Sequence, residues 1–209
     1  GYKTQFAEDL DLNKGIPKWK SASFDDSDWE HPYVSSNPVP GLYTLVPQET
    51  PPLALEKVWP VKVVKTAEGR FFVDFGTELT GSTCFIVTGP KDHVVEIRHG
   101  EELSGANEVR YDMRAGCLYQ EFCTLSGREK EKIEFFDYKG FRYVEVLNWP
   151  EELEPENVWV FNRHYPFSDD ACSFESSDEL LNQIWELCKN GVEQGTQDTY
   201  LDCPTREKG

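Results

Sequence analysis

The chain has 209 residues, of which 21 are basic and 38 acidic, so its formal net charge is −17 at neutral pH. A field of that sign repels phosphate backbones, and no basic stripe overrides it locally, which excludes nucleic-acid binding. With 13 Phe, 9 Tyr and 6 Trp, the chain has enough large apolar surface for a core and is not disordered. No apolar run approaches the ~20 residues that a membrane helix needs.

The first residue is Gly1 rather than Met, and no charged-then-apolar leader precedes the first predicted elements. We therefore expect the native start to be missing or processed, and the sequence assigns no compartment, cytoplasmic or periplasmic. It also contains no pattern that sets an oligomeric state.

The cysteines and histidines do not form a metal-binding pattern. No C-x-x-C pair is present and no two histidines stand at i and i+4, so we predict no metal site and no cofactor. Several cysteines lie in apolar runs, as Cys84 does, and we expect buried free thiols. His93 and His99 lie six residues apart and are expected to be on the surface. The cysteines are Cys84, Cys117, Cys123, Cys172, Cys188 and Cys203.

Proline dominates the end of the first segment, residues 1–52. Because proline removes backbone donors and fixes φ, this segment cannot be regular sheet or helix throughout. We interpret it as the tail of a preceding β module followed by a connector. Its later prolines are Pro38, Pro40, Pro47, Pro51 and Pro52.

Residues 53–165 have the alternating pattern of half-buried strands. Phe71, Val73 and Phe75 are apolar residues at every second position, and Val95 and Ile97 have the same spacing further on. Gly-, Pro- and Asn-containing turns separate these runs, and no helical pattern lies between them. Several short strands joined by turns predict a mainly β domain, an antiparallel β-sandwich.

The segment 166–209 changes to a helical pattern. A capping box from Ser176 to Glu179 predicts the start of the helix. Apolar residues then recur at spacings of three and four, which places them on one side of the helix. Among them Trp185 could be a platform for a sugar, but we favour core packing. We interpret the segment as the start of a further domain that is incomplete in this chain. The apolar positions are Leu181, Ile184, Trp185, Cys188 and Val192.

An acidic loop follows the predicted helix. Cys203 precedes Pro204, so its backbone is biased toward an extended conformation. Asp202 and Glu207 therefore lie on a constrained loop, which is where catalytic groups tend to sit. Composition alone favours the alternative that both carboxylates are simply solvated.

The order of residues in this loop carries a family resemblance. Residues 202–207 read Asp-Cys-Pro-Thr-Arg-Glu, which resembles the Asp-Cys-Pro-x-Arg-Glu pattern of bacterial α-L-rhamnosidases. Three upstream segments, 73–81, 98–103 and 139–146, resemble strands of the sandwich that precedes the catalytic barrel in that family. The four segments occur in the family's order and cover about residues 73–209.

The resemblance implies an inverting glycoside hydrolase with an (α/α)₆ barrel, whose first helix is the one predicted here. Glu207 would be the general acid, and Asp202 would hold the hydroxyls of rhamnose in a glycoside or polysaccharide. We expect Arg206 to contact a substrate hydroxyl or a structural carboxylate rather than Glu207. The general base would be a Glu downstream of residue 209, about 6.5–9.5 Å from the acid. We therefore expect this chain alone to be inactive.

Two other interpretations remain open at this point. The sandwich could be a non-catalytic carbohydrate-binding module, with Trp149, Trp159 and Tyr143 as conceivable contacts. It could also be a structural domain of another barrel glycosidase, because such layouts serve several specificities. We favour rings that fill the core or an interdomain face, and a supporting role for the sandwich.

Overall fold

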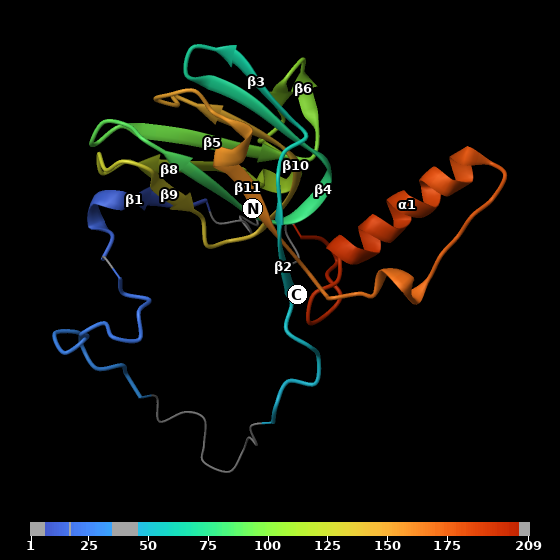
Figure 1. The fold of residues 1–209 in the computed structure, drawn as a ribbon, viewed down its shortest axis with the longest axis horizontal. Coiled ribbons are helices and arrows are strands. Elements are labelled where there is room, and N and C mark those ends of the chain that lie inside the picture. The colour runs from blue at the N-terminus through green and yellow to red at the C-terminus, as the bar shows by residue number, and fades with distance from the viewer. Residues whose placement is uncertain (1–6, 17, 35–45, 205–209) are drawn as a thin grey trace.

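The computed structural model describes residues 7–16, 18–34 and 46–204, and strands dominate it (Figure 1). The strands are β1 (Asp9–Asp11), β2 (Ala54–Val58), β3 (Lys62–Ala67), β4 (Arg70–Val87), β5 (Val94–Gly100), β6 (Leu103–Gly105), β7 (Glu108–Val109), β8 (Gln120–Thr124), β9 (Glu131–Glu134), β10 (Lys139–Leu147) and β11 (Val158–His164). The helices are α1 (Glu179–Gln194) and the short 3-10 helices η1 (Leu12–Lys14), η2 (Arg114–Gly116), η3 (Pro155–Asn157) and η4 (Asp169–Ala171).

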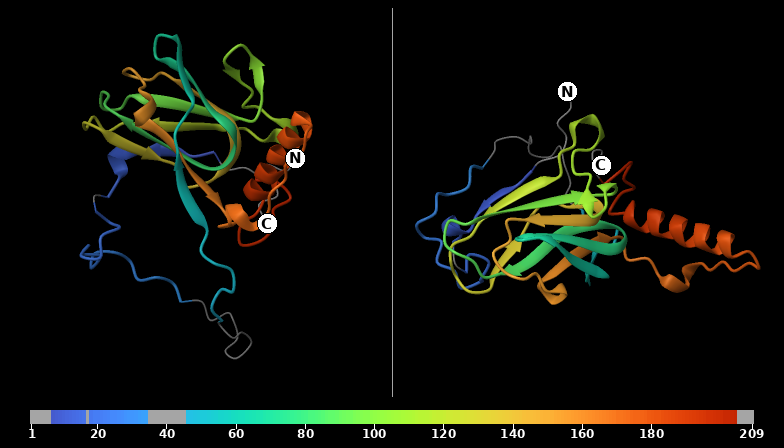
Figure 2. Two further views of the ribbon diagram at one scale, coloured as in Figure 1. Left: turned by 45° about the vertical axis from the view of Figure 1, so that its right-hand side comes forward. Right: turned by 90° about the horizontal axis from the view of Figure 1, so that it is seen from above.

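The long strand β4 belongs to both layers of a curled sheet. Its residues 70–74 pair with β3 and β10, whereas its residues 81–87 pair with β11 and β9. One layer therefore has the order β3-β4-β10-β5-β8-β1, and the other has the order β9-β4-β11-β2. The curl is visible in Figures 1 and 2. Within the described residues only the β1–β8 pairing is parallel, and the predicted antiparallel β-sandwich is confirmed.

Alternate side chains of β4 fill the space between the layers. Phe71, Val73 and Phe75 are almost fully buried, because successive side chains of a strand point to opposite faces. Val144 and Val146 of β10 join the same core. Burying each such side chain contributes about 1.5–3 kcal/mol, so this continuous core is what holds the two layers together.

The N-terminal segment takes part in the sheet. Strand β1 extends the edge at β8, and the carboxylate of Glu8 accepts hydrogen bonds from the amides of Phe136 and Asp137 at 3.0 and 2.7 Å. Pro38 and Pro40 of the predicted connector lie outside the described residues. The division of the chain at residues 52 and 165 stays a prediction.

A polar network is buried between the layers. The Nε2 of His99 lies 2.9 Å from the Thr83 hydroxyl, and its Nδ1 lies 3.7 Å from the Glu121 carboxylate, which also pairs with Lys139. Burial, with the nearby Lys139 charge, lowers the pKa of His99 well below 6.5, so the ring is neutral at pH 7. The expectation that His99 lies on the surface is wrong, because hydrogen bonding to other strands offsets the cost of its burial.

Helix α1 begins two residues later than the sequence indicated. The Oδ1 of Asp178 accepts from the amide of Leu180 at 2.9 Å and caps the helix. The Ser176 hydroxyl instead accepts from the Asp178 amide at 3.1 Å. The expected capping box of Ser176 and Glu179 is therefore wrong, although both residues flank the true start.

The helix projects away from the sandwich, so much of its apolar side is open (Figures 1 and 2). Trp185 stacks on Phe174 with ring centroids 5.5 Å apart rather than entering the sandwich core. Neither ring belongs to the cluster of buried residues between the two layers. The exposed apolar side chains of the helix are Leu180, Leu181, Ile184, Leu187 and Val192.

The cysteines are free, as expected, but only some are buried. Cys84, Cys117 and Cys123 are buried, whereas Cys172 and Cys188 are exposed. The prediction of buried thiols is thus wrong for the two cysteines at and near the projecting helix. In the described part of the chain no group of three His, Cys, Asp or Glu side chains is placed to hold a metal ion. No helix there is long and apolar enough to cross a membrane.

Candidate functional site at the junction of the sandwich and the acidic loop

Buried hydrogen bonds attach the end of α1 to β4. The Thr80 amide donates to the Oε1 of Gln194 at 2.7 Å, and the Thr80 hydroxyl donates to the Gln194 carbonyl at 3.0 Å. The Nδ2 of Asn190 donates to the carbonyl of Glu78 at 3.1 Å. Thr80 and Gln194 are shielded from water, where hydrogen bonds are strengthened by the low local dielectric. The helix end is therefore fixed to the sandwich.

Strand β11 holds the residues that follow the helix. The Nε of Arg163 donates to the Oε1 of Gln197 at 2.5 Å, and the Nε2 of Gln197 donates back to the Arg163 carbonyl at 3.1 Å. One residue earlier, the Thr196 carbonyl accepts from the Tyr165 amide at 2.8 Å. This reciprocal pairing fixes both the position and the direction of the chain as it leaves the helix.

The loop then turns back before it reaches Asp202. Thr196 forms an isolated bridge with Tyr200, and the Leu201 amide donates to the Gly195 carbonyl at 2.9 Å. Asp202 follows at once and its side chain is exposed. A carboxylate on a turn tied down in this way is accessible and has a defined backbone position.

Of the three predicted site residues, Asp202 lies within the described part of the chain. Arg206 and Glu207 lie outside the described residues. Their roles, and the role of Asp202, therefore stay predictions from the resemblance.

Close packing at Gly140 seats the loop on the sandwich. A Cβ atom at Gly140 would lie 2.6 Å from the Cγ of Pro204 and 3.3 Å from its Cβ. Real Cβ atoms do not approach other carbons to 2.6 Å, so the loop can take this position only because residue 140 has no side chain. Pro204 stands two residues after Asp202 and three before Glu207, so this contact lies within the predicted acid loop.

Glu78 places an unusual carboxyl group at the same contact. Its Oε1 would lie 3.5 Å from a Cβ at Gly140. Burial, reinforced by the Glu101 charge, raises the pKa of Glu78 to about 8, although Arg142 acts in the opposite direction. At neutral pH this carboxyl is therefore largely protonated, and the sandwich presents a neutral acid group beside the loop.

Some motif residues of the sandwich have a structural role. Both carboxylate oxygens of Asp74 accept from the Arg142 guanidinium, at 2.8 and 3.0 Å. Burial raises the pKa of Asp74, but Arg142 and the amide of Gly76 outweigh it, so that the pKa is lowered. Gly76 itself has φ +84°, a conformation that side-chain-bearing residues rarely adopt. Two distant sequence segments thus meet through their motif residues.

The aromatic residues considered as sugar contacts are largely unavailable. Trp149 is buried against Phe85, with ring centroids 5.6 Å apart, and Trp159 is buried beneath Lys57. Tyr143 is half-buried and stacks on Phe72. The expectation that these rings serve packing is confirmed for the two tryptophans.

The sequence alone does not reveal this junction. Gly140 and Glu78 stood inside segments that resemble the family, and that resemblance was their only signal. Thr80, Gln194 and Gln197 are polar residues of ordinary appearance, and their pairing with distant strands depends on the fold.

Comparison with known proteins places this junction between two matched domains. Residues 64–163 match the model of the bacterial α-L-rhamnosidase concanavalin-like domain. Residues 169–209 match the model of the bacterial α-L-rhamnosidase six-hairpin glycosidase domain. The two matches follow each other in order and together cover about two thirds of the chain. The chain belongs to the bacterial α-L-rhamnosidase family.

Individual relatives agree with this assignment. An α-L-rhamnosidase of Streptomyces avermitilis is 29% identical over 202 residues, which are 95% of this chain and 19% of the relative. A second α-L-rhamnosidase, from Formosa agariphila, is 25% identical over 91% of this chain and 20% of its own length. The chain therefore spans about a fifth of the length of these curated relatives.

Solved structures share the fold over nearly the whole chain. The α-L-rhamnosidase structure from Dictyoglumus thermophilum has a TM-score of 0.78 and 27% identity, covering 95% of this chain and 22% of that one. The Streptomyces avermitilis enzyme, solved in complex with L-rhamnose, has a TM-score of 0.77 and 27% identity, covering 95% of this chain and 19% of that one. The β-sandwich of this rhamnosidase-family chain is thus the sandwich of known family members.

Proposed function

We propose that the full-length protein hydrolyses terminal α-L-rhamnosides with inversion at the anomeric carbon. The observation that carries the proposal is the Asp-Cys-Pro-Thr-Arg-Glu loop at residues 202–207, which starts from a helix end fixed to a rhamnosidase-family sandwich. The relatives are named α-L-rhamnosidases, and one was solved with L-rhamnose. A rhamnose-containing glycoside or polysaccharide is therefore the proposed substrate.

The proposed mechanism divides the work of the loop among three residues. Glu207 donates a proton to the departing glycosidic oxygen, which needs a carboxyl group that is still protonated near neutral pH. Asp202 accepts hydrogen bonds from rhamnose hydroxyls, as its exposed position on a fixed turn allows. Arg206 contacts a substrate hydroxyl or a structural carboxylate, because pairing with Glu207 would lower the pKa of the acid.

The sandwich has a positioning role in this proposal. Catalytic groups must be held close to their productive geometry, and a misplacement of about 1 Å can lower the rate about 100-fold. Gln194, Gln197 and Pro204 tie the helix end and the loop to three strands. The general base is expected outside this chain, which covers about a fifth of its relatives. We therefore propose that the chain alone is inactive.

Replacement of Glu207 by Gln in the full-length protein tests the acid role. We expect kcat to fall by about 10²–10⁴-fold on a rhamnoside with a sugar or alkyl leaving group, which needs protonation as it departs. The loss should be much smaller on nitrophenyl α-L-rhamnoside, because nitrophenolate leaves readily without a proton. Steady-state kinetics on the two substrates measure this difference.

Glu129→Gln supplies the control, since Glu129 is an exposed glutamate in the turn between β8 and β9. It should leave both rates unchanged. Equal losses on the two substrates after Glu207→Gln, or no loss on either, would contradict the acid role. Release of nitrophenol by the 209-residue chain itself would show that the base is not missing from it.

A further inference from the structure

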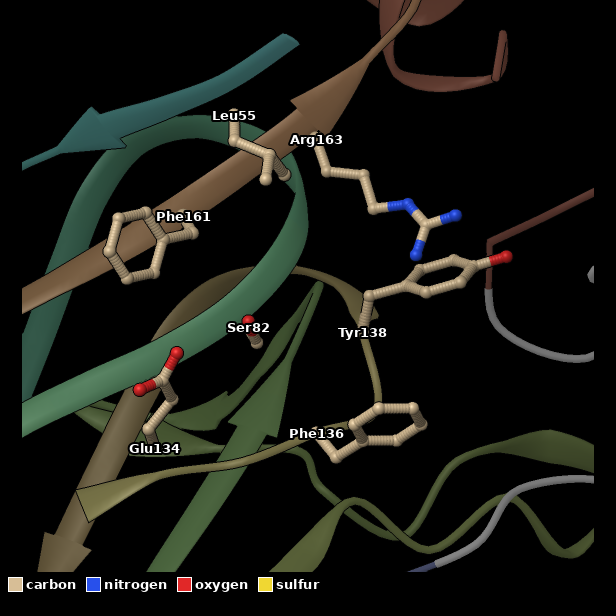
Figure 3. A pocket seen from close by; sticks show the side chains of 7 residues that line it. All are labelled: Leu55, Ser82, Glu134, Phe136, Tyr138, Phe161 and Arg163. Carbon is tan, nitrogen blue, oxygen red and sulfur yellow. The ribbon is translucent and has the colours of Figure 1, made fainter. Parts of the chain in front are cut away.

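A cleft opens on the outer face of the layer formed by β9, β4, β11 and β2 (Figure 3). Its volume is about 280 Å³, close to the lower end of the ~300–1,000 Å³ of small-molecule sites. It is lined by Leu55, Ser82, Glu134, Phe136, Tyr138, Phe161 and Arg163. We call it the Phe161 cleft.

The cleft places aromatic side chains among polar ones, on a face where a sandwich normally meets water with polar groups alone. On β11, Val160 and Asn162 are buried between the layers, so Phe161 and Arg163 point outward. Outward positions of antiparallel sheets are usually polar. Phe136 at the rim is 96% exposed, so its ring is open to contact by a ligand in the cleft.

The walls of the cleft are already fixed. The Arg163 guanidinium lies 4.5 Å from the centre of the Tyr138 ring and is held there by Gln197. The Glu8 carboxylate, through the amides of Phe136 and Asp137, fixes the backbone between the two aromatic residues of the rim. A ligand would therefore meet a preformed site and would not have to order it.

The polar groups of the cleft suit a ligand rich in hydroxyls. The Oε2 of Glu134 is paired with Lys132 at 2.5 Å, which leaves its Oε1 as an acceptor, while Arg163 offers donors and the Ser82 hydroxyl can do both. The ammonium groups of Lys57 and Lys132 lie 5.7 and 5.4 Å from the centre of the Phe161 ring, so a cation is disfavoured here. The exposed Phe136 ring is left open for the apolar C–H face of a sugar, because the face of an aromatic ring is electron-rich.

We propose that the Phe161 cleft binds a sugar ring of a rhamnose-bearing glycan, at a site separate from the predicted acid loop. The choice of glycan rests on the proposed function, whereas the site rests on the cleft itself. Arg163 links the two regions, because it lines the cleft and also holds Gln197 ahead of the loop. The cleft thus supplies a second point of attachment for a long substrate.

Titration of this chain with two probes tests the proposal. The probes are methyl α-L-rhamnopyranoside and a neutral rhamnose-containing oligosaccharide, followed by calorimetry and by NMR shifts. We expect Kd values of about 1–10 mM for the monosaccharide. Phe136→Ala should weaken binding at least about fivefold, as loss of an aromatic contact does, and Glu134→Gln should weaken it as well.

Phe136→Ala should leave folding intact, because the ring has almost no packing to lose. Tyr33→Ala is the matched control, since Tyr33 is 88% exposed and does not line the cleft. It should leave Kd unchanged. If neither probe binds, the proposal is wrong. It is also wrong if both cleft variants leave binding intact, or if the chain self-associates and Phe136→Ala abolishes that self-association.

The same variants separate this proposal from the proposed function. If the chain binds sugar in the cleft but the full-length protein does not hydrolyse rhamnosides, the cleft proposal holds and the proposed function is wrong. If the full-length protein hydrolyses rhamnosides but the cleft binds no sugar, the proposed function holds and the cleft proposal is wrong. In an active full-length protein, Phe136→Ala should raise KM for the oligosaccharide and leave kcat for nitrophenyl α-L-rhamnoside unchanged.

Discussion

At the scale of single residues, Gly140 is the position where the sandwich touches the predicted acid loop most closely. Replacement by Ala places a methyl group 2.6 Å from the Pro204 Cγ. The backbone of residue 140 is paired with Thr80 in the sheet, so the loop must move. We expect a loss of about 1–3 kcal/mol in stability from overpacking. In the full-length protein kcat should fall at least about tenfold as the acid loop is displaced. Chemical denaturation and steady-state kinetics measure the two effects.

Gly191→Ala is the matched control for this prediction. A Cβ at Gly191 meets nothing within 4 Å, and the residue lies in a helix, where Ala is favoured over Gly by about 0.5–1 kcal/mol. It should stabilise the chain slightly and leave kcat unchanged. If Gly140→Ala lost stability and kept full activity with an unchanged pH profile, the contact with Pro204 would be structural only.

Gly140 also shows how far the sequence reveals the role of a single residue. The order Asp-Cys-Pro-Thr-Arg-Glu predicts the acid loop because residues 202–207 together carry a specific pattern. Gly140 stood in an equally visible segment, but its role depends on Pro204, which is 64 positions away in the chain. A contact across such a separation leaves no local trace, so it had to come from the structure.

At the scale of elements, α1 depends on its last turn for attachment. Gln194→Ala removes the nearer of two acceptors of the buried Thr80 amide, which keeps the Oδ1 of Asn162 at 3.3 Å, so it should cost about 0.5–1.5 kcal/mol. Gln183→Ala makes the same chemical change at an exposed position of the same helix. We expect faster amide exchange across α1 for the first variant and not for the second, with the core of β4 protected in both. Equal exchange in the two variants would contradict the anchor.

The elements themselves were predictable to different degrees. The strands followed from period-two alternation, as in Phe71, Val73 and Phe75, because a two-layer core imposes that period directly. The helix followed from its apolar spacing, but its cap did not, because Ser176 and Asp178 are both good caps and only the local backbone selects one. What covers Leu187 and its neighbours does not follow from the sequence, because the spacing shows a face and not its partner.

At the scale of the whole molecule, the junction should make stability depend on pH. The pKa of Glu78 is raised from its ordinary 4.5 to about 8 in the folded chain. Between these values the folded chain keeps a proton that the unfolded chain releases. Folding therefore takes up a proton, and stability falls as pH rises from about 4.5 to about 8. His99 acts in the opposite sense, because its lowered pKa removes stability as pH falls below 6.5.

A difference measurement isolates the Glu78 contribution. Glu78→Gln keeps the shape of the side chain and cannot ionise, so its Tm minus that of the wild type should grow as pH rises from 5 to 8, by ~3 °C or more. The other titrating groups, His99 among them, are common to both proteins and cancel. Glu129→Gln removes one exposed carboxylate that faces water in both states and should give a much flatter difference. If the Tm of Glu78→Gln minus that of the wild type stays flat or shrinks with rising pH, then Glu78 is ionised at neutral pH in the folded chain.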